Sequence, residues 1–94
     1  MNGLIGRFAL SKAGHDKDTL YVVIRADEKF LYLCDGKFHG MHKLKKKSRK
    51  HVMLYNNFVS SELLQRMMNE ENIFDHEIKY AIKMQINGKE EGYV

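Results

Sequence analysis

The sequence predicts a mainly β fold of about five short strands followed by two short helices. Up to about residue 58, short runs of β-branched and aromatic residues are separated by turn signals such as Gly14 and Asp35-Gly36. Beyond Asn56-Asn57 the apolar residues recur at helical spacing instead. The charge changes at the same place: residues 1–55 hold twelve Lys or Arg and five Asp or Glu, whereas residues 56–94 hold four and seven. We therefore expect a basic β module at 1–58 and an acidic helical appendage at 59–94.

Two strands joined by a polar corner begin the module, Gly6–Leu10 and Leu20–Ile24. Alternation in the first strand places Arg7, Ala9 and Ser11 on one face. Gly14 permits a positive φ, so the chain is expected to turn there and to leave His15, Asp16 and Lys17 exposed. The period of two predicts that one buried apolar face is made by Phe8, Leu10, Val22, Ile24 and Leu54.

This corner resembles the KOW motif of RNA-binding ribosomal proteins. The resemblance is carried by the lead-in glycine Gly6, the LSKAG corner at residues 10–14, a short charged loop and the YVVI return at residues 21–24. The chain is similar to small bacterial KOW-domain proteins related to large-subunit ribosomal proteins of the fourteen-e and twenty-seven-e type, as far as about Leu54. That resemblance implies an SH3-like barrel and binding to ribosomal RNA. Asp18 departs from the pattern, because the family often has a second glycine there.

The remaining strands are predicted on the expectation of this barrel. Phe30–Cys34 is dense in aromatic and aliphatic residues and predicts the third strand. A short fourth strand around Phe38–Met41 would suit the barrel of the family, with Lys45–Lys50 following as an exposed arm. Val52–Tyr55 is the expected closing strand, with Val52 and Leu54 pointing inward.

Both predicted helices are short and amphipathic. Ser60 is a plausible N-cap for the first, whose apolar face would hold Leu63, Leu64, Met67 and Met68. The second begins near Asp75, with that carboxylate as its cap, and Asn87-Gly88 is a stop signal. Its apolar stripe would comprise Ile78, Ala81, Ile82 and Gln85-Ile86. Helices of this length are marginal alone, so they should pack on the barrel, on each other or on a partner.

The basic stretch Lys37–His51 is the predicted RNA contact. It contains seven Lys or Arg and no acidic residue, which favours binding to phosphate over a merely solvated loop. Phe38 is expected either to stack on an unpaired base or to lie in the core. With the corner, the predicted RNA-binding residues are Lys12, His15, Lys17, His39, His42, Lys43, Lys45, Lys46, Lys47, Arg49 and Lys50.

Other functional classes have weaker support in the sequence. Cys34, His39, His42 and His51 include zinc-ligand types, but a second close Cys pair is missing, so no metal or cofactor is predicted. The nucleophiles Cys34, Ser11, Ser60 and Ser61 have no catalytic motif around them, so the protein is expected not to be an enzyme. The single cysteine and the lack of a long apolar run predict a soluble cytoplasmic protein.

A protein-interaction module is the alternative to RNA binding. Small barrels of this class also bind proteins, and a transcription or ribosome-assembly adaptor would use the barrel edge or the methionine-bearing helices. Met67-Met68 is the sequence feature that favours this alternative, because methionines adapt to varied partners, although they also fill ordinary cores.

Overall fold

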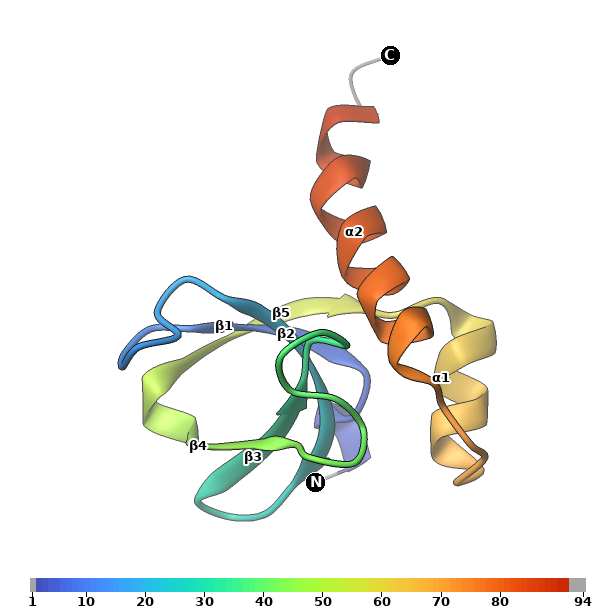
Figure 1. Ribbon diagram of the computed structural model, residues 1–94. Helices are drawn as coiled ribbons and strands as arrows, with labels where there is room; N and C mark the ends of the chain where they lie inside the picture. The colour runs from blue at the N-terminus through green and yellow to red at the C-terminus, as the bar shows by residue number, and fades with distance from the viewer. Residues whose placement is uncertain (1, 92–94) are drawn as a thin grey trace.

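A computed structural model describes residues 2–91 and shows a small β barrel followed by two helices (Figure 1). The strands are β1 (Arg7–Ser11), β2 (Leu20–Ala26), β3 (Phe30–Cys34), β4 (Lys45–Ser48) and β5 (Val52–Phe58). The helices are the 3-10 turns η1 (Asn2–Leu4) and η2 (Arg49–His51), and the α-helices α1 (Ser61–Met68) and α2 (Asp75–Glu91). The predicted fold class is confirmed.

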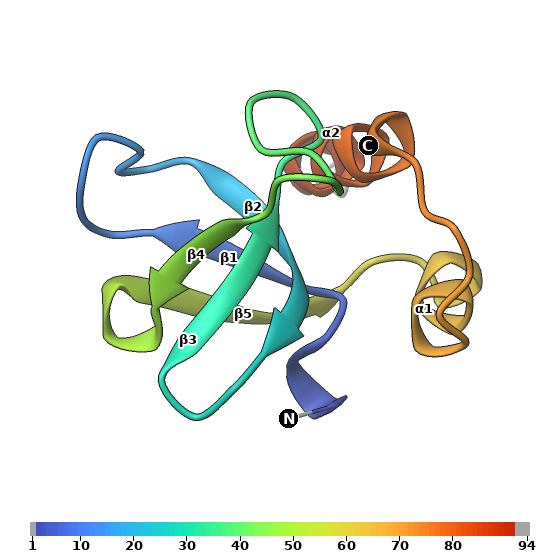
Figure 2. The same ribbon diagram turned by 60° about the horizontal axis from the view of Figure 1, so that its bottom comes forward.

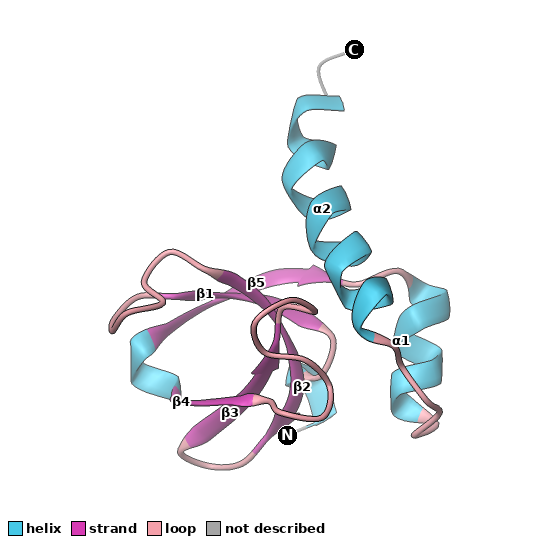
Figure 3. Ribbon diagram, viewed as in Figure 1, coloured by secondary structure: helices cyan, strands magenta, loops and turns pink. Residues whose placement is uncertain are grey.

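The five strands form one antiparallel sheet in the order β4-β3-β2-β1-β5. β1 pairs with β2 through Phe8 and Val22, and with β5 through Ser11 and Val52. The sheet curls into an SH3-like barrel that is open between β4 and β5, the two outer strands of this order (Figure 3). The turn η2 crosses this open side: Arg49 N donates to Lys29 O at 2.9 Å, and Lys12 N donates to His51 O at 2.8 Å.

Both faces of the sheet carry buried apolar side chains, and this corrects the predicted inner face. The barrel interior is made by Ala9, Tyr21, Val23, Leu31 and Leu33, all 0% exposed, with Val52 and Leu54 packed against them as predicted. Phe8 and Val22, expected to point inward, lie on the outer face of the sheet instead. Strand alternation separates two sets of side chains but does not say which set points inward when both are apolar.

Two helices cover the outer face. Phe8, Val22 and Cys34 pack there against Leu63 of α1, Ile78 of α2, and Val59 and Ile73 in the segments that precede these helices. Ile78 is 0% exposed, so the beginning of α2 is part of the hydrophobic core. The rest of α2 projects away from the barrel in Figure 1. Residues 59–82 therefore contribute to the core of the module.

The fourth strand was predicted in the wrong place. Residues 38–41 form a loop, and β4 is the lysine-rich segment that was expected to be an exposed arm. β4 pairs with β3 in the register Leu33 to Lys45 and Leu31 to Lys47. Lysine has low β propensity but is common on edge strands, where its charge discourages pairing with other chains. Pairing with β3, and not local propensity, therefore determines the position of this strand.

The first residues of both helices were predicted correctly, but the end of the second helix was not. Ser60 Oγ accepts a hydrogen bond from Leu63 N at 3.3 Å, which confirms the N-cap. The Asp75 carboxylate does not act as the predicted cap: its Oδ1 accepts from Met41 N at 2.7 Å, in the loop before β4. α2 also continues through Asn87-Gly88 to Glu91.

Candidate nucleic-acid interface

The corner after β1 is a tight loop with two residues at positive φ. Gly14 has φ +87° and Asp18 has φ +73°. Asp18 N donates to Ser11 O at 2.8 Å, which closes the loop back onto the end of β1. Asp18 thus takes a left-handed conformation, one that aspartate tolerates better than most residues. Lys12, His15 and Lys17 are exposed on this corner, as predicted.

Asp16 was predicted to be exposed, but its side chain turns inward. Its carboxylate accepts hydrogen bonds from Ser11 Oγ at 3.0 Å, Tyr21 OH at 2.7 Å and Lys47 Nζ at 2.7 Å, and only 14% of the side chain is exposed. Burial, the largest influence, acts to raise the pKa of Asp16, but the donors Lys47, Tyr21 and Ser11 outweigh it and hold this pKa well below its ordinary value. Burial and the neighbouring Asp16 carboxylate raise the pKa of Tyr21. The corner is therefore fastened to the barrel by an ionised carboxylate.

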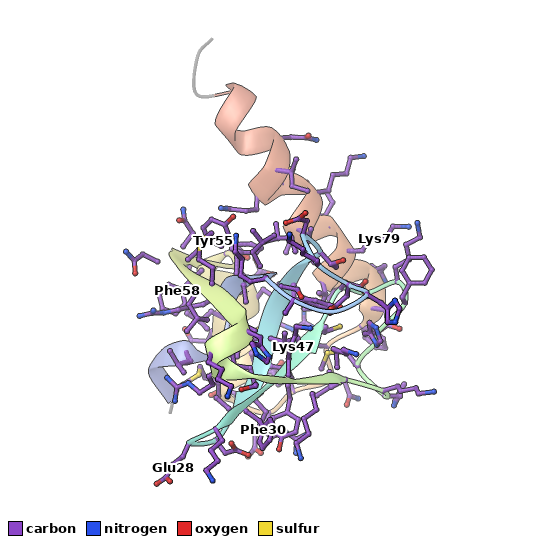
Figure 4. The ribbon with its side chains drawn as sticks, turned by 90° about the vertical axis from the view of Figure 1, so that its left-hand side faces the viewer. Glu28, Phe30, Lys47, Tyr55, Phe58 and Lys79 are labelled. Atoms are coloured by element: carbon purple, nitrogen blue, oxygen red, sulfur yellow. The ribbon has the colours of Figure 1, made fainter. Side chains whose placement is uncertain are left out.

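Lys47 belongs to this network, and its contacts argue against the RNA-binding role predicted for it. Its ammonium donates to Asp16 Oδ1 and to Ala13 O, each at 2.7 Å, and the side chain is 10% exposed. Figure 4, viewed toward the open side of the barrel, shows Lys47 near the centre of this side. An ammonium held by two acceptors has little capacity left for a phosphate, so the structure gives Lys47 a role in closing the barrel.

The other basic residues of this stretch differ in exposure. Lys45 is half-buried opposite Leu33, and Lys46 is exposed, with its Nζ 4.3 Å from the ring centroid of Phe30. Arg49 is half-buried, and its Nη1 donates to Asp27 O at 3.4 Å. Lys50 is exposed on η2. Of these four, Lys46 and Lys50 are the most accessible to a polyanion.

Exposed basic side chains from two separate segments, the corner and η2, converge on the open side of the barrel. We call these residues the basic face: Lys12, His15, Lys17 and Lys50. The bond from Lys12 N to His51 O and the bonds of Lys47 to the corner hold the segments together. In Figures 1 and 2 the corner loop and η2 lie on the same side of the barrel. Lys12, Lys17 and Lys50 form no ion pair with any side chain that the structure describes.

A second basic segment, residues 35–44, lies beside the beginning of α2, and we call it the Phe38 loop. His42 and Lys43 are exposed, whereas His39 is half-buried with its ring 6.1 Å from that of Tyr21. Phe38 is 76% exposed, so the hypothesis that it belongs to the core is wrong. Because Tyr21 contacts both His39 and Asp16, the loop and the corner are neighbours.

A cross-strand row on the outer face of β2, β3 and β4 was missed in the sequence. Arg25 pairs with Tyr32, and Tyr32 pairs with Lys46. The Arg25 guanidinium lies 5.8 Å from the Tyr32 ring, and Tyr32 OH donates to Asp27 Oδ2 at 2.9 Å. The row borders an open pocket of about 410 Å³ that His42 also lines. Strand registers bring these residues together, and nothing in their sequence spacing would have shown it.

A larger apolar pocket lies between the two α-helices and the end of β5. It has a volume of about 420 Å³, and its lining includes Phe8, Phe58, Leu63, Tyr80 and Met84. At its rim Arg66 forms an ion pair with Glu77 and a hydrogen bond to Asn72 O. Met67, predicted as part of a binding surface, is half-buried against the core, and Met68 is 45% exposed.

Among residues 2–91, no three His, Cys, Asp or Glu side chains are placed to hold a metal ion together. Cys34 is 0% exposed, and burial raises the pKa of its thiol to about 11. Within the same residues no helix is long and apolar enough to cross a membrane. A scan of family models finds no match to the chain, and a search of curated proteins finds no significant relative.

Proposed function

We propose that the protein binds structured RNA without catalysing a reaction, through phosphate contacts made by the basic face and the Phe38 loop. The observation that carries this proposal is the convergence of exposed basic side chains from the corner and η2 on one side of the barrel. Lys12, Lys17 and Lys50 remain free of ion pairs with the described side chains, so they can neutralise a partner's charge.

The chemistry of these residues favours recognition of RNA shape over sequence. A lysine ammonium is a point charge that contacts phosphate and carries little information about bases. Each neutralised phosphate releases condensed counterions, so the affinity should fall steeply as salt is added. A polyanion bound across the corner and η2 would be gripped by segments whose spacing the barrel sets, and a spacing of this kind selects a particular arrangement of phosphates.

Ribosomal RNA is the proposed target within this class. The support for it is the resemblance of residues 6–54 to the KOW-domain ribosomal proteins, and on this proposal the protein would act in the cytoplasm with the large ribosomal subunit. The charge pattern by itself supports only a polyanionic partner. Crosslinking in cells followed by sequencing of the bound RNA tests this directly, since ribosomal RNA, other RNA and no RNA are separate outcomes.

Charge reversal on the basic face tests the RNA proposal. We expect the double variant Lys17→Glu/Lys50→Glu to bind a structured RNA at least roughly tenfold more weakly, and the slope of log affinity against log salt to decrease by about two. Both side chains are exposed, so the fold should be unchanged. The measurement is a titration by fluorescence anisotropy at several salt concentrations.

The matched control is Lys83→Glu, compared with the single variant Lys17→Glu. Lys83 is exposed on α2, and its reversal changes the net charge by the same amount. Equal losses in the two variants, or an affinity that does not respond to salt, would mean that the basic face is not an RNA site.

The apolar pocket supports a second candidate function, docking of a protein segment. Phe58 and Met84 are each 41% exposed there, and apolar side chains lining a concave surface are typical of protein-binding sites. A Met84→Glu variant separates the candidates: it should retain full RNA affinity if RNA binding is the function, and it should lose a protein partner recovered with the wild-type chain if docking is.

A further inference from the structure

We infer that the Phe38 loop holds an unpaired nucleobase against the ring of Phe38, so that the protein prefers RNA with an unpaired nucleotide over an uninterrupted helix. The inference rests on the proposed function and names the RNA feature that is recognised. Its basis is the combination of an exposed ring, a loop that is fastened in place, and a lysine ammonium beside the ring.

Phe38 is the most exposed large apolar side chain that the structure describes. It is 76% exposed, compared with 63% for Tyr80 and 57% for Phe74. A single exposed apolar residue is ordinary on a protein surface. The exposure of Phe38 is informative because the backbone on both sides of it is held in place.

The start of the loop is fastened by Asp35 and Gly36. Asp35 Oδ1 accepts hydrogen bonds from Lys37 N at 2.9 Å and from His39 N at 2.8 Å, and Asp35 N donates to His39 O at 3.0 Å. These bonds enclose Phe38 in a short closed turn. Gly36, at φ +74°, lies against α2 so closely that a Cβ there would be 2.3 Å from Asp75 O.

The end of the loop is fastened to the same helix. Met41 N donates to Asp75 Oδ1, and a Cβ on Gly40 would be 2.5 Å from Asp75 Oδ2. The Phe38 ring is therefore presented to solvent from two anchored ends, and moving it into the core would break these contacts. A preorganised aromatic ring loses little conformational freedom when a ligand stacks on it.

The charges around the ring favour a nucleotide over an apolar partner. Lys37 Nζ lies 5.0 Å from the centre of the Phe38 ring, and His42 and Lys43 are exposed in the same loop. A base stacked on the ring would bring its own phosphate near the Lys37 ammonium, whereas an apolar segment would remove water from this ammonium without compensating it. The loop also adjoins the corner through His39 and Tyr21, so one RNA can contact both.

A pair of RNA ligands tests the inference on the full chain. One is a helix with a single bulged 2-aminopurine, a fluorescent base that dims when it stacks, and the other is the same helix without the bulge. We expect the wild-type protein to bind the bulged RNA roughly tenfold more tightly, the value of about one stacked base, and to quench its fluorescence further. Phe38→Ala should remove the preference and the quenching, while Phe38→Trp should retain both.

Phe74→Ala is the matched control, because Phe74 is also exposed but lies beside His76 at the start of α2. It should behave as the wild type, and the salt dependence of binding should be the same in all variants. Equal affinity of the wild type for both RNAs, or a preference that survives in Phe38→Ala, overturns this inference and leaves the basic face as an RNA site. Absence of salt-dependent RNA binding by the wild type overturns the proposed function and this inference together.

Discussion

Two ion pairs hold different parts of the molecule together, and they differ in burial. Lys47 and Asp16 join β4 to the corner at 2.7 Å, with side chains 10% and 14% exposed, and Ser11 and Tyr21 also bind the carboxylate. Arg66 and Glu77 join α1 to α2, with side chains 29% and 22% exposed. Breaking a buried pair leaves an uncompensated charge, whereas water can solvate the groups of a more exposed one. A lysine within a basic run can therefore stabilise the fold while its neighbours remain available to a partner.

The two pairs also close different interfaces. The Lys47 pair spans the open side of the barrel, where β4 and β5 do not pair and no sheet hydrogen bonds join them. The Arg66 pair supplements an apolar interface. Leu63 of α1 and Ile78 of α2 already belong to the same buried cluster. We therefore expect the barrel to depend on its ion pair and the helices to depend mainly on apolar packing.

The largest expected effect is on the barrel pair. Lys47→Ala should lower the free energy of unfolding by about 3–5 kcal/mol, because it leaves the Asp16 carboxylate without its cation. Arg66→Ala should cost a small fraction of that, since water replaces the lost contacts. Chemical denaturation of both variants measures the difference, and equal losses would contradict the comparison.

The apolar attachment of the helices should be nearly as important. Ile78→Ala removes a side chain that is 0% exposed, and it should lower the free energy of unfolding by about 2–5 kcal/mol. Ile86→Ala is the matched control on the same helix, because Ile86 is 54% exposed and its loss should change stability by less than about 0.5 kcal/mol. Near-ultraviolet circular dichroism monitors unfolding of the barrel. If α2 were only an appendage, the unfolding measured in this way would be unchanged in both variants.

A smaller effect is expected from acid. The pKa of Asp16 is held below its ordinary value of 3.8, so the folded state binds this proton more weakly than the unfolded state does. Its contribution to stability is complete above 3.8 and is lost as the pH falls through and below that value. The pKa of Glu77 is also lowered by Arg66, from 4.5, so part of the acid sensitivity arises between the helices.

Removing each carboxylate separates these two contributions. Denaturation of Asp16→Asn and Glu77→Gln, from neutral pH down to about pH 3, should show a flatter profile for both variants and the larger change for Asp16→Asn. A profile for Asp16→Asn that matches the wild type would mean that the barrel pair is not the acid-sensitive element. The result would then favour the helix pair as the stronger of the two.

Much of the fold could be predicted because local signals and tertiary structure agree. The β-branched run at residues 20–24, the aromatic run at residues 30–34 and the cap at Ser60 all have the expected structure. The prediction of β4 was wrong because a lysine-rich segment has little β propensity of its own, and its strand exists by pairing with β3. The inner face of the sheet was also misassigned, since the alternating residues on both faces are apolar and the helices cover one of them.

The candidate site was predictable as a region but not residue by residue. The density of positive charge in residues 37–51 identified the stretch, and yet a run of lysines does not show which ammonium points into the barrel. Lys47 does so because it is in register with Leu31 on the interior side of β4, within reach of Asp16. The row formed by Arg25, Tyr32 and Lys46 depends on strand register in the same way, because its members lie far apart in the chain.

The mainly β composition, the change to helices near residue 58 and the concentration of positive charge in the first part of the chain follow from the order of residues, because propensity, periodicity and charge are local properties. Tertiary contacts are needed to establish which lysines are exposed, which face of the sheet the helices cover and that Phe38 is held in solvent by α2. These features come from contacts between residues far apart in the chain, such as Met41 with Asp75 and Lys47 with Asp16. Their free energies depend on burial and distance, which the order of residues does not specify.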